Sequence, residues 1–137
     1  MKKYALILLI LFLTAGLFSC KKEKDYKPEI TAFLQKWTIS IRDLNYTDYK
    51  NMVKYVKSET QFNEKYRYYY PEQPVILDIK KYYDDGNILR FRLNVSFYGI
   101  DRAKKVKKSD INSILIVEKK GKEYKVDETI FIDNKYN

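Results

Sequence analysis

The spacing of apolar residues changes once along this chain, near Val75, and this change restricts the fold more than any other feature. Before Val75, apolar residues recur every three or four positions, which is the period of an amphipathic helix. After it, they alternate with polar residues, which is the period of a strand with one buried face. The sequence therefore predicts helices first and a sheet second.

A long first helix is predicted over residues 28–45. Pro28 suits the first helical turn, and Glu29 interacts favourably with the helix dipole there. The predicted apolar face consists of Ile30, Phe33, Leu34, Trp37, Ile41 and Leu44.

Two shorter helices are predicted after it. Thr47 is expected to cap the first of them. Ser58 and Gln61 form the capping-box pattern that opens the other. Pro71 and Pro74 are expected to exclude any further helix, because proline lacks the N–H that a helix interior requires.

The second half of the chain predicts four strands, over residues 75–80, 89–98, 111–119 and 123–132. Gly86 and Gly121 lie in the two short turns, where a positive φ is needed. In the first strand, Val75 and Leu77 are expected to face one side and Ile76 the other. Residues 99–110 are interpreted as a basic loop that could approach anionic lipid or an acidic partner.

Residues 1–20 have the order of a secretory signal, with Lys2 and Lys3 first, then an apolar run, then small residues before Cys20. The apolar run is shorter than the roughly 18–20 residues that a transmembrane helix needs. The tetrapeptide LFSC at 17–20 resembles a bacterial lipobox. This resemblance implies cleavage before Cys20 and attachment of acyl chains such as palmitate there.

The predicted organisation is a lipoprotein signal peptide over residues 1–19, a lipid-bearing tether over 20–27 and one domain over 28–137. The protein would then be anchored in a bacterial cell envelope by the lipid on Cys20. Lys21 stands where aspartate usually signals inner-membrane retention, which favours the outer membrane. Plain secretion and an uncleaved membrane anchor are the alternatives.

The amino-acid composition limits the partners and cofactors that can be expected. The chain has a net charge of +9, which favours anionic surfaces, and an envelope location makes nucleic acid a poor partner. It has no histidine and one cysteine, so an intrachain disulfide is excluded and neither a transition metal nor another cofactor is predicted.

The order of elements resembles the NTF2-like (SnoaL-like, cystatin-like cone) superfamily. The matching positions are Trp37 and Asp43 in the first helix, Tyr49 in the second, and the lysine–glycine turn with its following strand at 119–126. The resemblance implies an α+β fold in which N-terminal helices pack on a curved antiparallel sheet of about four strands. It also implies a pocket between the first helix and the sheet.

Glu128 is the first candidate for a site in that pocket. Strict alternation would place it with Tyr124 and Val126 on the concave side, where a carboxylate needs a partner or has a raised pKa. The alternative is a structural carboxylate paired with a lysine or lying at the rim. The full candidate pocket consists of Trp37, Tyr49, Phe91, Tyr124 and Glu128.

Two further features have competing interpretations. Asp43 matches the superfamily's acid at the end of the first helix, but a solvated helix-end residue is the simpler interpretation. The tyrosines at 66 and 68–70 are divided between packing on the sheet and recognition at the surface.

Three functions compete. The first is a non-catalytic module that binds a small apolar or glycan ligand, or an envelope protein. The second is a dimeric interaction or structural protein with exposed apolar residues around Ile76, Tyr82 and Tyr98. The third is a small isomerase- or dehydratase-like enzyme with a carboxylate and a tyrosine, which ranks last because histidine is absent.

Overall fold

The computed structural model describes residues 22–102 and 106–128, without the side chains of residues 69, 73 and 106–112. The predicted signal peptide and Cys20 lie outside the described residues. In chain order the elements are α2 (Lys27–Arg42), α3 (Tyr46–Met52), α4 (Glu59–Tyr66), β1 (Tyr69–Asp84), β2 (Ile88–Asp101), β3 (Val106–Lys120) and β4 (Glu123–Asp127).

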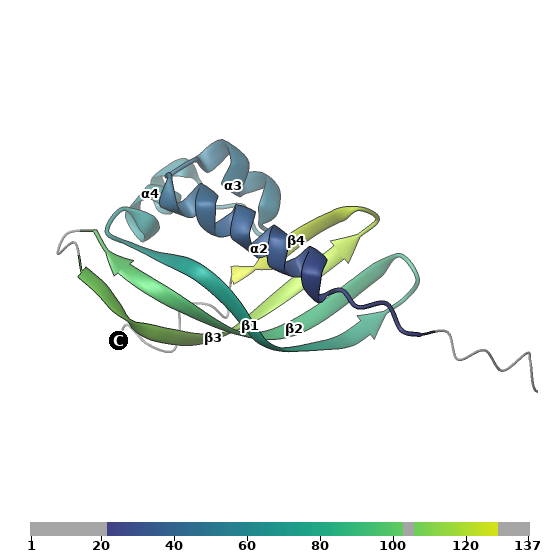
Figure 1. Ribbon diagram of the computed structural model, residues 1–137. Helices are drawn as coiled ribbons and strands as arrows, with labels where there is room; N and C mark the ends of the chain where they lie inside the picture. Colours follow the sequence, from purple (N-terminus) through teal and green to yellow (C-terminus); the bar gives the residue numbers. More distant parts are fainter. Residues whose placement is uncertain (1–21, 103–105, 129–137) are drawn as a thin grey trace, which may run out of the picture.

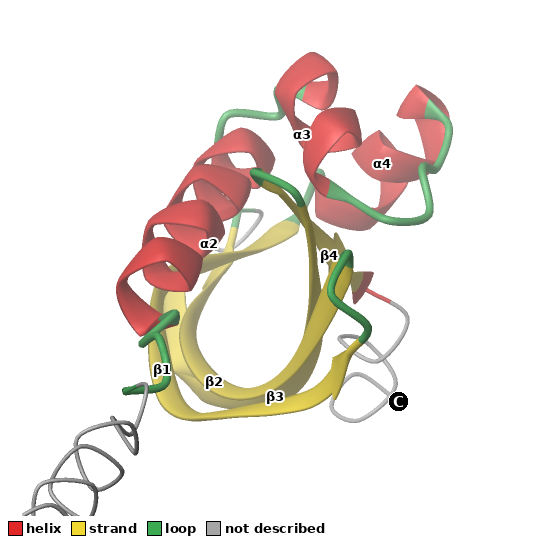
Figure 2. Ribbon diagram, turned by 90° about the vertical axis from the view of Figure 1, so that its right-hand side faces the viewer, coloured by secondary structure: helices red, strands yellow, loops and turns green. Residues whose placement is uncertain are grey.

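The predicted α+β class is confirmed. The strands form one antiparallel sheet in the order β1-β2-β3-β4, and the sheet curls around the helical side of the molecule (Figures 1 and 2). Helix α2 lies along the open side of this curl, against β1, while α3 and α4 cover its far end.

The helix signals are mostly confirmed. Glu29 lies in the first turn of α2, and Ser58 and Gln61 form the reciprocal capping box of α4. The second helix is present, but its predicted N-cap residue was wrong. Asn45 and not Thr47 caps α3, because the Asn45 side chain accepts a hydrogen bond from the backbone N–H of Asp48.

Strand β1 begins six residues earlier than predicted and includes both prolines. It is the first strand in the sheet order and pairs with β2 alone, so Pro71 and Pro74 are tolerated as they are on an edge strand.

Val75 and Leu77 are exposed and Ile76 is buried opposite Val95, so these three residues alternate as predicted, but Ile76 does not contribute to an exposed apolar face as the dimer hypothesis required. A register shift between Ile76 and Asp78 breaks the alternation after Leu77, and Ile79 packs against the core.

Two other strand boundaries differ from the predictions. The prediction of a long basic loop over residues 99–110 was wrong, because β2 continues to Asp101 and β3 begins at Val106. Charged residues in this part of the chain belong to strands, where one face can remain in water. Strand β4 ends at Asp127, and the rest of the predicted strand beyond Glu128 lies outside the described residues.

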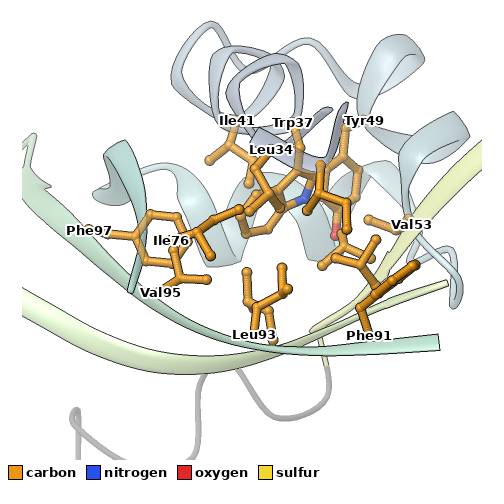
Figure 3. Close-up of a cluster of buried hydrophobic side chains, with 14 of the residues drawn as sticks. Leu34, Trp37, Ile41, Tyr49, Val53, Ile76, Phe91, Leu93, Val95 and Phe97 are labelled. Carbon is orange, nitrogen blue, oxygen red and sulfur yellow. The ribbon is translucent and has the colours of Figure 1, made fainter. Parts of the chain in front are cut away.

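The core fills the space between α2 and the concave face of the sheet (Figure 3). The alternation along β2 is regular, so Phe91, Leu93, Val95 and Phe97 all point inward and are at most 1% exposed. Trp37 of α2 lies edge-on to Phe97, with ring centroids 6.1 Å apart. The concave face is therefore occupied by the protein's own side chains.

Residues 22–26, which the sequence predicts to be tether, contact the domain. The carboxylate of Glu23 is 2.9 Å from the ammonium of Lys81 in β1. The Tyr26 ring lies 5.0 Å from the ring of Phe91 in β2. The chain is thus fixed to the end of the sheet that carries the β1–β2 turn before α2 begins.

Candidate functional site

Glu128 follows directly after β4, and its position depends on how that strand ends. Val53, just after α3, forms a parallel bridge with Val126, and the N–H of Lys54 donates to the Val126 carbonyl over 2.9 Å. These contacts bring the end of β4 under α3 and α4. Glu128 is 8% exposed in this position.

Four donors from three helices converge on the Glu128 carboxylate. The Trp37 indole N–H (2.9 Å) and the Tyr66 hydroxyl (3.0 Å) donate to Oε1. The Tyr49 hydroxyl (2.6 Å) and the Lys65 ammonium (3.1 Å) donate to Oε2. Because a carboxylate offers about four lone-pair positions, these donors use its full accepting capacity.

The electrostatics of this cluster follow from burial beside a negative charge. Burial, together with the neighbouring Glu128 carboxylate, raises the pKa of the Tyr49 and Tyr66 hydroxyls well above their ordinary range. Both tyrosines therefore stay protonated and act as donors. Burial, with a smaller contribution from the nearby Lys57, lowers the pKa of Lys65 to about 8, against the opposing attraction of Glu128.

The candidate pocket residues separate into two groups. Trp37, Tyr49 and Phe91 are buried core residues, and the first two donate to Glu128. Tyr124 lies elsewhere: its hydroxyl donates to a Glu29 oxygen at 2.5 Å, and its ring packs against Phe33.

Asp43 does not join the Glu128 cluster. It is exposed at the C-terminal end of α2 and pairs with Arg42 at 2.9 Å. The hydrogen bond from Arg42 holds the pKa of the Asp43 carboxyl below its ordinary value. This geometry is that of a surface residue at a helix end.

Lys65 and Tyr66 were not predicted to contact Glu128. Tyr66 was noted among the clustered tyrosines, of which Tyr68 is exposed and Tyr70 is partly buried. A local signal for Tyr66 exists, because it lies four residues after Phe62 and both are on the buried face of α4. Lys65 gives no such signal, because a lysine in a short polar helix normally faces water.

A surface groove lies between α2 and the edge strand β1, away from Glu128. Its apolar lining includes Ile39 and Val75, which are 45% and 52% exposed. Its remaining lining residues are Gln35, Thr38, Arg42, Pro71, Glu72 and Pro74.

No protein-family model, curated protein or solved structure matches the chain. Within residues 22–102 and 106–128, no helix is long and apolar enough to cross a membrane. Within the same ranges, no group of three or more Asp, Glu, Cys or His side chains could hold a metal ion.

The Glu128 cluster predicts a large and specific loss of stability when the carboxylate is removed. Glu128→Gln leaves the Lys65 ammonium without its counter-charge and turns an amide N–H₂ toward other donors. Breaking a buried pair in this way should cost about 3–5 kcal/mol, measured by urea unfolding. Adding Lys65→Met to this variant should recover part of the loss.

Glu118→Gln is the matched control. Glu118 pairs with Arg90 at 2.9 Å and Lys54 at 3.1 Å, but all three side chains are partly exposed. The control should therefore lose only about 1 kcal/mol. Equal losses from the two Glu→Gln changes would contradict the structural role assigned to Glu128.

The lowered pKa of Lys65 predicts a rise in stability with pH. Between about pH 8 and the ordinary lysine value of 10.5, the unfolded chain binds a proton that the folded chain has released. The free energy of unfolding should therefore increase from about pH 8 to about pH 10. Above that, it should fall, because the unfolded chain loses phenolic protons that Tyr49 and Tyr66 retain in the fold.

Urea unfolding of wild type and Lys65→Met at about pH 7 and about pH 9.5 checks this. The variant should lose the rise between these two values. Identical pH slopes for both proteins would show that Lys65 is not the group responsible.

Proposed function

We propose that this protein is a lipid-anchored, non-catalytic binding module of a bacterial cell envelope, which engages a partner protein through its surface. The observation that carries the proposal is the filled concave face. Trp37, Tyr49 and Phe91, which an NTF2-like pocket would use to line a ligand site, are at most 1% exposed in the core.

The lipid anchor is supported by the sequence at 17–20 and by the apolar run before it. Acyl chains on Cys20 would hold the protein at the membrane, since burial of each methylene contributes about 0.8 kcal/mol. With Lys21 next to the cysteine, the outer membrane is the expected location.

Partner binding is favoured over ligand binding by the groove between α2 and β1. Ile39 and Val75 are exposed there beside the edge of the sheet. An edge strand offers unpaired backbone groups, and an apolar groove beside it can accept side chains of an extended segment. The groove is open to solvent, whereas sites for small apolar ligands bury most of the ligand.

Catalysis by Glu128 is the weaker alternative. A tyrosine does lie within hydrogen-bond reach of the carboxylate, as an isomerase-like enzyme would need. However, four protein donors already occupy the two oxygens, so no position is left for a proton from substrate. A dimer through the outer sheet face, where Tyr82 and Tyr98 are exposed, is the remaining alternative.

A photo-crosslinking experiment in cells tests the proposal. A photoreactive residue at Val75 should give one adduct of defined mass with another protein, and Cys20→Ala should move the protein to the soluble fraction and reduce the adduct several-fold. The same probe at Thr60, exposed on α4, is the matched control and should give none.

Three results would contradict the proposal. One is a mature protein without acyl mass on Cys20, and another is unchanged membrane fractionation of Cys20→Ala. The third is equal crosslinking from Val75 and Thr60, or an adduct whose mass is that of a second copy of this chain.

A further inference from the structure

The N-terminal segment is fixed to one end of the domain. Lys24 pairs with Glu29 at 2.5 Å, which adds to the contacts of Glu23 with Lys81 and of Tyr26 with Phe91. The β1–β2 and β3–β4 turns lie at this same end, beside the start of α2 (Figure 1). We call it the hairpin end: residues 22–27, 82–88 and 119–123.

Very little chain separates the hairpin end from the proposed lipid. One residue, Lys21, lies between Cys20 and Lys22, the first described residue. Consecutive Cα atoms are about 3.8 Å apart, so Lys22 lies within about 8 Å of Cys20. An acyl chain on Cys20 inserts in the hydrocarbon region, which leaves no room for a long spacer between headgroups and domain.

We propose that the hairpin end is a membrane-contact surface that rests on anionic lipid headgroups, with the long axis of α2 leading away from the bilayer. This inference rests on the proposed lipidation of Cys20. It adds an orientation, because residues 22–26 contact the sheet through Glu23 and Tyr26.

The chemistry of the hairpin end suits a headgroup layer. Tyr82 and Tyr83 are 51% and 39% exposed near the β1–β2 turn, and tyrosine is enriched at membrane–water interfaces. Five exposed lysines lie on the other two segments of the hairpin end, and lysines near an anionic membrane are attracted to it. They are Lys22, Lys24, Lys27, Lys120 and Lys122.

Most acidic groups at the hairpin end have partners within the fold. Glu23 and Asp84 both contact Lys81. Glu29 accepts from Tyr124 and pairs with Lys24, while Asp85 accepts the backbone N–H groups of Asn87 and Ile88. Their charge is therefore partly compensated. Asp25, which accepts the backbone N–H of Lys27, and Glu123 are exposed acids beside the lysines.

In this orientation, the end of the domain that carries the C-terminal end of α2 faces away from the bilayer and is accessible to a partner protein. Arg102, at the start of the β2–β3 connection, donates to the carbonyls of Ile41 and Arg42 at the C-terminal end of α2. The basic stretch that the sequence suggested for lipid contact thus begins at the end of the domain opposite residues 22–26. The groove with Ile39 and Val75 lies toward this opposite end.

Fluorescence quenching on vesicles tests the orientation. A fluorophore is attached to Asn87→Cys at the β1–β2 turn or to Asp43→Cys at the opposite end of α2; both positions are exposed. The lipidated protein is reconstituted in vesicles of phosphatidylglycerol and phosphatidylcholine with nitroxide-labelled headgroups. The Cys20 sulfur is blocked by its thioether, so each variant carries one label.

The label at position 87 should be quenched about threefold or more relative to position 43. Equal quenching, or stronger quenching at position 43, would overturn the orientation. The acyl mass on Cys20 is measured on the same sample. If that mass is present and quenching is equal, only the orientation fails; if the mass is absent, the proposed function fails as well.

A charge-reversal pair tests the headgroup contact separately. Lys120→Glu with Lys122→Glu should lower quenching at position 87 about twofold on the anionic vesicles. Lys36→Glu with Lys50→Glu, which changes charge equally on α2 and α3, should not. Equal effects of the two pairs, or no loss with the first, would show that the lysines of the hairpin end do not contact the headgroups.

Discussion

The hydrogen-bonded carboxylate of Glu128 is the interaction on which the rest of the structure depends. Removing an ionised carboxylate from water is costly, and the cost is tolerated only where donors replace the lost hydration. Here the donors come from α2, α3 and α4, through Trp37, Tyr49 and the pair Lys65 and Tyr66. One side chain at the end of β4 therefore joins all three helices to the sheet.

Because the concave face of the sheet is filled, we expect binding to take place at the outer surface of the domain. In a curved sheet that wraps a helix, the space between them is the natural pocket, but Trp37, Phe91 and Phe97 fill it here. What remains exposed lies at the surface: the groove with Ile39 and Val75, and the hairpin end with Tyr82 and its lysines. If Cys20 carries lipid, these two surfaces face different surroundings, one the bilayer and the other the space beyond it.

The fold class was predictable because it depends on the spacing of apolar residues, and this spacing can be observed within each short segment of the sequence. The regular alternation from Phe91 to Phe97 and the capping box at Ser58 are of this kind. The start of β1 was missed because Pro71 and Pro74 are excluded from a central strand but allowed at an edge, and sequence alone does not show where the edge is. The partners of Glu128 were missed for a related reason. The sequence shows only that Tyr66 shares a helix face with Phe62, and it gives no signal for Lys65, because both reach Glu128 through the tertiary packing of α4.

Hydrogen exchange of the Trp37 indole N–H tests the central claim most directly. Trp37 is the only tryptophan in the chain, so its indole proton gives a single assignable signal in an NMR spectrum. If this N–H is buried and bonded to Glu128, it should exchange only when the whole domain unfolds, with a free energy equal to that from urea unfolding. Exchange within the dead time of the measurement would place the indole in contact with water and show that the concave face is an open pocket.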